Sequence, residues 1–200
     1  MSPLSKPVSL ALSMLLLTLS PCVVLMQSME TAHAQATETQ RQQLKQIIIE
    51  GLKQLQSAQY DRALETFQQV LKLSRRMRDR EYESTILHNI GLVYNALGQY
   101  AKALEFNQQA LEIARDIGDR PGEGQTLYNI GAVYDKLGQY DKALELNQQA
   151  LKIQRDVGDR PGEGKTLGNI GSVYNNLGQY DKALEFNQQA LTIFRDRSEE

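Results

Sequence analysis

Cysteine and histidine are nearly missing from this 200-residue chain, and tryptophan is missing altogether. The one cysteine is Cys22, so the sequence offers no disulfide framework and no cysteine-ligated metal site. Histidine occurs only at His33 and His88, too few for a convergent set of acid, base, nucleophile or metal-ligand groups. Positive charge is not in excess, and a net charge of −2 argues against a nucleic-acid binder. The sequence therefore predicts a protein that is not an enzyme and that binds no metal, cofactor or nucleic acid.

Long apolar runs are confined to the N-terminus. Lys6 precedes an apolar run over residues 8–26, and a polar segment then ends in Ala32-His33-Ala34. This is the layout of a secretory signal peptide with a cleavage site between small residues. We expect residues 1–34 to be a signal peptide, and the mature protein to be exported, periplasmic or secreted, with no membrane contact. The alternative is an anchor formed by residues 8–26, which are just numerous enough to span a bilayer.

The rest of the chain is built from a repeat of 40 residues. Residues 121–160 and 161–200 are identical at 28 of 40 positions without a gap, and residues 81–120 fit the same frame. A fixed period of this length indicates a stacked array of supersecondary units. We expect a disordered segment at 35–43, a divergent first repeat at 44–80, and three repeats at 81–120, 121–160 and 161–200.

Each repeat predicts two helices. In the first repeat, Leu44, Ile47, Ile48 and Leu52 have the spacing of an amphipathic helix, and a second helix is expected over residues 60–78. Later repeats place a glycine between the two helices, where it can adopt the left-handed conformation that ends a helix; these are Gly98, Gly138 and Gly178. Asp119 and Asp159 are expected to cap the helix that follows them. No window alternates with period two, so the expected fold class is all-α.

Small residues recur inside the helices. Gly91, Gly131 and Gly171 lie mid-helix, where glycine costs about 1 kcal/mol relative to alanine. A cost repeated at a fixed period indicates close approach of two helices. We expect the facing surface at Ala103, Ala143 and Ala183, with Tyr94, Tyr134 and Tyr174 beside it.

The pattern NIGxVYxxLGQYxKALExxQQAL, at residues 89–111, 129–151 and 169–191, resembles the tetratricopeptide repeat (TPR) family. The resemblance covers about residues 41–197, and its 40-residue period is similar to that of kinesin light chains, spindle-orientation adaptors and bacterial arrays linked to CHAT domains. It implies a right-handed solenoid of about four helix pairs whose concave surface holds peptides. The sequence departs from the family at Asn107, Asn147 and Asn187, where a large apolar residue is usual, and at Glu50 and Ala58 in the first repeat.

Gly162-Glu163-Gly164-Lys165-Thr166 imitates part of a phosphate-binding loop. The glycine that such a loop needs at position 159 is an aspartate, and Pro161 removes a backbone donor from the cradle. We expect the first turn of a helix there and no nucleotide binding.

The two nearly identical repeats indicate where function lies. Their first helices differ at only five positions: Gln125/Lys165, Tyr128/Gly168, Ala132/Ser172, Asp135/Asn175 and Lys136/Asn176. These positions fall within an arc of roughly 100° on the helix, opposite the core residues. This predicts a binding face; drift of exposed positions is the alternative.

Asparagines border this face in every later repeat, and an amide can pair with a peptide backbone of any sequence. The predicted peptide-binding residues are Thr85, His88, Asn89, Leu92, Asn95, Gln125, Tyr128, Asn129, Ala132, Asp135, Lys136, Lys165, Asn169, Ser172, Asn175 and Asn176. Because Asn129 and Asn169 lie outside the core arc, their replacement is expected to cost little stability.

The predicted function is a non-catalytic scaffold that binds an extended peptide segment of a partner protein in a concave groove. One alternative is a structural module that self-associates, for example as a homodimer, through its uncapped last repeat, where Phe186, Leu191, Ile193 and Phe194 lie. Another is the repeat part of a larger signalling system.

Overall fold

The computed structural model describes residues 21–198, and within them every regular element is a helix. The chain divides into two compact units, Met1–Gln46 and Ile47–Glu200. The first helix, α2 (Pro21–Gln56), begins in one unit and ends in the other. No helix in residues 21–198 has the length and apolarity needed to cross a membrane.

The described part of the first unit is helical throughout. Residues 35–43, for which we expected disorder, belong to α2, and Gln42 donates a hydrogen bond to Glu38 one turn earlier. Glutamine, arginine and glutamate lose little side-chain freedom in a helix, which favours this course over disorder. The expected signal peptide lies partly outside the described residues, and its cleavage remains a prediction.

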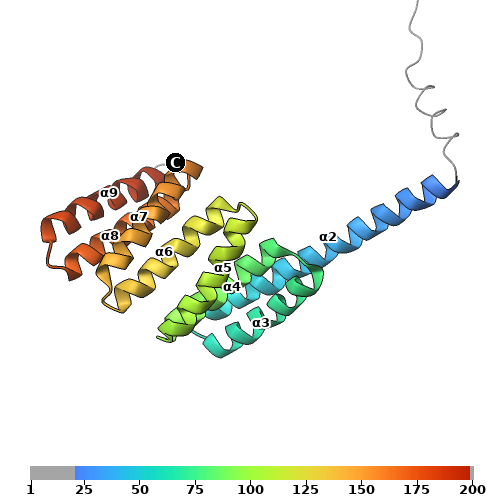
Figure 1. Cartoon of the computed structure of the whole chain (residues 1–200), viewed down its shortest axis with the longest axis horizontal. Helices are drawn as coiled ribbons and strands as arrows, with labels where there is room; N and C mark the ends of the chain where they lie inside the picture. Colours follow the sequence, from blue (N-terminus) through green and yellow to red (C-terminus); the bar gives the residue numbers. More distant parts are fainter. Residues whose placement is uncertain (1–20, 199–200) are drawn as a thin grey trace, which may run out of the picture. The chain divides into compact units, whose positions relative to one another are not determined.

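The second unit consists of antiparallel helices in sequential contact (Figure 1). After the end of α2 come α3 (Tyr60–Met77), α4 (Arg80–Ala96), α5 (Tyr100–Asp116), α6 (Arg120–Lys136), α7 (Tyr140–Val157), α8 (Arg160–Asn176) and α9 (Tyr180–Ser198). We call α4, α6 and α8, with residues 47–56 of α2, the A helices, and α3, α5, α7 and α9 the B helices. The pairs match the repeat boundaries, so the predicted helix pairs are confirmed.

Helix ends follow the predicted signals. Gly98, Gly138 and Gly178 have φ angles of +69°, +69° and +72°, so each adopts the left-handed conformation that the turn requires. The carboxylates of Asp119 and Asp159 accept hydrogen bonds from the backbone N–H of Gly122 and Gly162, both at 2.9 Å. The glycine-rich stretch after Asp159 is the start of α8, as expected.

The mid-helix glycines lie closest to asparagines, and at Gly171 the expected alanine is near as well, because an added Cβ atom would lie 3.2 Å from the Ala183 carbonyl oxygen. A Cβ atom added to Gly91 would lie 2.6 Å from Asn107 Nδ2, and one added to Gly131 would lie 2.8 Å from Asn147 Oδ1. Asn107 and Asn147 are fully buried. The asparagine that departs from the family pattern therefore fills the space that the glycine leaves, and the two residues form a matched pair.

Aromatic residues close the same interfaces. Tyr94 stacks on Phe106 with ring centroids 5.3 Å apart, and the Lys102 ammonium lies 5.1 Å from the Tyr94 ring centroid. The same arrangement recurs at Tyr174, Phe186 and Lys182. The tyrosines thus supply the bulk that was predicted beside the glycines.

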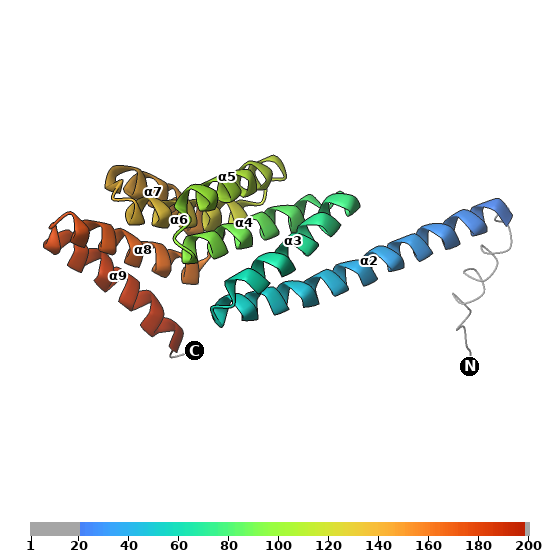
Figure 2. The same cartoon turned by 90° about the horizontal axis from the view of Figure 1, so that it is seen from below.

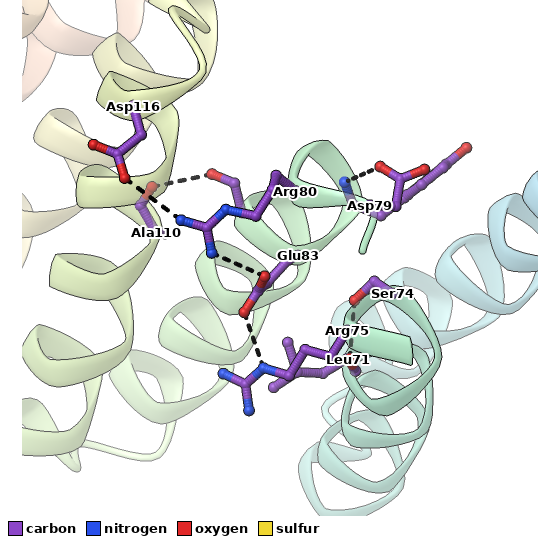
Figure 3. A network of polar contacts seen from close by, with 10 residues as sticks. Leu71, Ser74, Arg75, Asp79, Arg80, Glu83, Ala110 and Asp116 are labelled. Atoms are coloured by element: carbon purple, nitrogen blue, oxygen red, sulfur yellow. Dashed lines mark hydrogen bonds and ion pairs between the residues drawn. The ribbon is translucent and has the colours of Figure 1, made fainter. Parts of the chain in front are cut away.

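Charged residues join each repeat to the next. Glu83 accepts from Arg75 of the preceding B helix at 2.9 Å and from Arg80 of its own helix at 3.1 Å, and Arg80 also reaches Asp116 at 3.5 Å (Figure 3). Ser84 Oγ donates to the carbonyl oxygen of Ala110 at 3.0 Å. The Arg–Glu–Arg junction recurs around Glu123 and Glu163, whose carboxylates are buried.

The stack curves toward its A helices. Besides consecutive helices, α4 contacts α6 and α6 contacts α8, whereas no B helix of the described chain contacts the next B helix. The A helices approach one another more closely than the B helices do, so they lie on the concave side of the curve. The faces of the A helices that point away from the B helices form the concave surface. Figure 2 shows the pairs from a second direction.

Candidate functional site

All sixteen predicted binding residues lie on the A helices α4, α6 and α8, but their exposure differs widely. Asn89, Asn129 and Asp135 are buried; His88, Leu92, Asn95, Gln125, Tyr128, Ala132 and Asn169 are half-buried; Thr85, Lys136, Lys165, Ser172, Asn175 and Asn176 are exposed. The structure therefore brings these residues to one side of the stack, and it divides them into an inner layer and an accessible layer.

His88 joins α4 to α6. Its Nδ1 lies 3.3 Å from Thr126 Oγ1, and Asn129 Nδ2 lies 3.1 Å from its Nε2. Burial lowers the pKa of the His88 imidazole from 6.5 to about 4, so the ring is neutral near pH 7. A neutral ring with its proton on Nδ1 donates to Thr126 and accepts from Asn129, which satisfies both contacts. His88 is thus an inter-repeat contact rather than an open ligand group.

The asparagine row is engaged within the protein. Asn129 is 4% exposed and donates to His88, whereas Asn169 donates to Asn147 Oδ1 of α7 at 3.2 Å. Asn89 is 6% exposed. The sequence placed these residues outside the core because it does not show how closely neighbouring repeats approach. Replacing Asn129 is therefore expected to affect stability as well, contrary to the sequence-based expectation.

A second inter-repeat contact joins α6 to α8. Asn176 Nδ2 donates to Asp135 Oδ1 at 2.9 Å, and Asp135 is buried. These two residues are among the five positions at which α6 and α8 differ. Part of that difference therefore adapts one repeat to its neighbour.

The accessible layer combines lysines with small polar groups. Lys136 and Lys165 are exposed on α6 and α8, and Ser172 is exposed on α8. Gly168 has open space around it, because a Cβ atom added there would meet nothing within 4 Å. Burial raises the pKa of the half-buried Tyr128, so its hydroxyl stays protonated at neutral pH and can donate a hydrogen bond. Such a surface suits an extended ligand with acceptor groups.

Other features of the surface lie elsewhere. An open depression on α7 is lined by Gln148, Leu151, Lys152, Arg155 and Asp156, none of which was predicted. In residues 21–198, no group of three or more His, Cys, Asp or Glu side chains could hold a metal ion.

Asn107 and Asn147 were not predicted as contact residues, yet they fill the space beside Gly91 and Gly131 of their own repeats, and Asn147 also accepts a hydrogen bond from Asn169 of the next repeat. Both recur with the 40-residue period and are fully buried. The signal was available, since a polar residue that repeats together with a mid-helix glycine indicates a paired contact.

A sequence profile described as tetratricopeptide repeat matches residues 51–116, 82–156 and 122–196. The chain belongs to the tetratricopeptide repeat family, and the resemblance found in the sequence is confirmed. The comparison with curated protein sequences finds no match. The TPR fold generally serves as a non-catalytic scaffold for protein interactions.

Solved structures confirm the fold. The chain is similar to BtubC (BKLC) from P. vanneervenii, at 21% identity with a TM-score of 0.65 over 76% of this chain and 63% of that one. It is also similar to the nearly identical TPR-like repeats assigned to a kinesin light chain of Podosopora anserina, at 22% identity and a TM-score of 0.62 over 77% and 76%. A Rap protein complexed with Competence and Sporulation Factor matches at 18% identity and a TM-score of 0.70 over 76% and 43%. The chain thus spans less than two thirds of the BtubC and Rap chains.

Proposed function

We propose that this protein is a non-catalytic scaffold that binds an extended segment of a partner protein along the outer faces of α4, α6 and α8. The observation that carries the proposal is that the amino-acid differences between α6 and α8 are confined to one face of the helix. Lys165, Gly168 and Ser172 replace Gln125, Tyr128 and Ala132, while the residues packed in the core are retained. Free drift would also alter the exposed face of α7 and α9, yet the exposed Gln148 and Gln149 of α7 recur as Gln188 and Gln189 of α9.

The Rap protein of similar fold, known in complex with Competence and Sporulation Factor, supports the idea that a helix stack of this kind holds a second molecule. Among the predicted binding residues the exposed cations are Lys136 and Lys165, and Asp135 already accepts from Asn176. The ligand is therefore an extended segment with acidic or carbonyl acceptors facing the two lysines.

The test is partner capture with the chain from Gln35 onward, followed by titration of the captured partner against charge-reversed variants. Lys165→Glu should weaken binding by about fivefold or more, because it repels an acidic segment. Lys152→Glu, an equal charge reversal at an exposed position of α7, should leave the affinity unchanged. A partner that binds both variants alike would contradict the proposed face.

Self-association through α9 is the second candidate function. Leu184, Leu191 and Phe194 are 59%, 67% and 41% exposed, which is unusual for large apolar side chains on one helix. Light scattering should then show a dimer that Leu184→Glu dissociates. A monomer at high concentration would contradict it.

We also propose that the protein is exported after cleavage near Ala34. The proposal rests on the order of features in residues 1–34, where a positive charge is followed by an apolar run and then by small residues at the expected cleavage site. N-terminal sequencing of the expressed protein should begin at Gln35, and retention of Met1 would contradict cleavage.

A further inference from the structure

The C-terminal end of α3 carries more positive charge than the matching ends of α5 and α7. Arg76 occupies the position of Asp116 and Asp156 in the 40-residue frame, so the charge at this position is reversed in the first repeat. Lys72 and Arg75 precede Arg76 by four residues and by one, and all three side chains are exposed. The last turns of α3 therefore present three cations with no acidic residue among them.

Arg78 holds a backbone conformation that is unfavourable for arginine. It ends α3 at φ +55° and ψ +30°, in the left-handed region, and its side chain is exposed. Gly118 and Gly158 occupy this position in the next two repeats, with φ angles of +71° and +74°. A Cβ atom makes the left-handed conformation less stable, so arginine costs stability where glycine does not. A cation at a helix C-terminus recovers some of this cost.

The arginines at this end of α3 fall into two groups. Arg75 and Arg80 bind Glu83 at 2.9 Å and 3.1 Å and so join α3 to α4 (Figure 3). Arg76 and Arg78 make no hydrogen bond or ion pair with any residue in the described part of the chain. The junction between the repeats thus uses the first two arginines and leaves the other two open to a ligand. We call Lys72, Arg76 and Arg78 the α3 basic cluster.

The spacing of the α3 basic cluster fits an extended chain. Lys72 and Arg76 are one turn apart on α3, so their positions are separated by about 6 Å along the helix axis. Alternate residues of an extended segment lie about 7 Å apart and point to the same side. Carboxylates at alternate positions of such a segment can therefore face Lys72 and Arg76. The guanidinium group of Arg78 can bind a third carboxylate with two hydrogen bonds.

Acidic residues around the cluster limit how broad its ligand can be. Glu81 is exposed in the first turn of α4, and the Asp116 side chain is 61% exposed and lies 3.5 Å from Arg80. A membrane surface or a nucleic-acid duplex would bring its negative charges against these carboxylates as well as against the cluster. A single extended segment can follow the cluster and leave both carboxylates in water.

We propose that the C-terminal end of α3 is a docking site for an acidic, extended segment of a partner protein, which the α3 basic cluster binds through the carboxylates of that segment. The site lies at the end of a B helix, so it does not depend on ligand binding by α4, α6 and α8. Binding there accounts both for the reversed charge at Arg76 and for an arginine in the left-handed conformation at position 78.

The test is a titration of the full chain with the labelled synthetic peptide Glu-Ser-Glu-Ser-Glu-Ser-Glu, blocked at both ends. Saturable binding with a Kd below about 1 mM at low salt is expected, and high salt should weaken it. The double variant Arg76→Asp, Arg78→Gly gives the first repeat the residues that α7 has at these positions, Asp156 and Gly158, so it should fold. It should weaken peptide binding by about tenfold or more.

Arg78→Gly alone separates a binding role from a structural one. Because glycine suits the left-handed conformation, this variant should raise the melting temperature while it weakens peptide binding by about threefold or more. Ala58→Gly is the matched control, since Ala58 also has a φ angle of +55° in the first repeat. It should raise the melting temperature and leave peptide binding unchanged. A lower melting temperature of Arg78→Gly together with unchanged binding would show that Arg78 only caps α3, and would overturn the proposal.

Two further variants locate the bound peptide. Lys152→Glu adds negative charge at the end of α7, at the position that matches Lys72, and should leave peptide binding unchanged. Lys165→Glu should also leave it unchanged, because Lys165 lies on the A-helix face. Loss of binding in Lys165→Glu but not in the double variant would place the acidic peptide on the A-helix face and overturn the proposal.

Anionic phospholipid vesicles test the other source of negative charge. Wild type and the double variant should bind these vesicles equally. Vesicle binding that the double variant abolishes would assign the cluster to a membrane surface and overturn the proposal. No saturable peptide binding, or equal peptide binding by wild type and the double variant, would overturn it as well.

Discussion

At the scale of single residues, the most informative feature is the pairing of a mid-helix glycine with a buried asparagine. Gly91 faces Asn107 and Gly131 faces Asn147, and both asparagines are fully buried, whereas Gly171 faces Asn187, which is exposed. Gly168 lies in α8 as well, but its neighbourhood is open. Gly131 and Gly168 thus both lie inside a helix, but a side chain at Gly131 would meet a close neighbour and one at Gly168 would not.

Alanine substitution should separate these two cases. Gly131→Ala should destabilise the protein by about 1–3 kcal/mol, because its Cβ would lie 2.8 Å from Asn147 Oδ1. Gly168→Ala should stabilise it by about 0.5–1 kcal/mol, because alanine is the better helix former and meets no neighbour. Chemical denaturation measures both changes. Equal changes in unfolding free energy for the two substitutions would show that helix propensity alone determines the effect of alanine at these positions.

His88 makes stability depend on pH. Its pKa is lowered to about 4 in the folded protein, against 6.5 in the unfolded chain, so the unfolded state binds the proton first as the pH falls. The contribution of His88 is complete above pH 6.5 and is lost progressively down to about pH 4, by up to about 3 kcal/mol. His88→Gln cannot titrate, so its unfolding free energy should fall less than that of the wild type over this window. Parallel pH profiles of the two proteins would contradict this expectation.

At the scale of elements, the repeats are joined by the Arg–Glu–Arg junctions. Glu163 pairs with Arg155 of α7 and with Arg160 of its own helix, and its side chain is 7% exposed while both arginines are about half exposed. Each junction thus connects a B helix to the next A helix and also supports the start of that A helix.

Glu163→Gln should lower the unfolding free energy by about 1 kcal/mol, because two partly solvated ion pairs are lost. The difference from wild type should shrink in high salt, which screens the pairs. Glu145→Gln is the matched control, since Glu145 is exposed and contacts Gln149 on its own helix. A loss that salt does not change would assign the effect to packing instead.

At the scale of the whole array, α8 is the described helix that packs on α9, and no described helix covers the outward face of α9. Leu184 and Leu191 of α9 are largely exposed, whereas Leu151 of α7 is covered by the next repeat. In a repeat array, stability is approximately the sum of the repeats and their interfaces, so a repeat with one interface opens more easily.

Amide hydrogen exchange should show this gradient. The backbone amides of α9 should exchange faster than those of α7, although their sequences are nearly the same. Equal protection of α7 and α9 would contradict the expected gradient.

The sequence by itself determined the helix pairs, their boundaries and the family. The identity of repeats 121–160 and 161–200, the glycine turns and the aspartate caps are local signals, and local hydrogen bonds and backbone conformations are set by residues close in sequence. The sequence also predicted which face of the A helices differs between repeats.

Only the tertiary structure decided which of those residues are accessible. Asn129 meets His88, and Asp135 meets Asn176, across a separation of 41 residues in each case. Such contacts depend on how closely successive repeats approach, which no single repeat specifies. The same reason explains α9: its sequence matches that of α7, but a surface is buried or open according to whether a neighbour covers it.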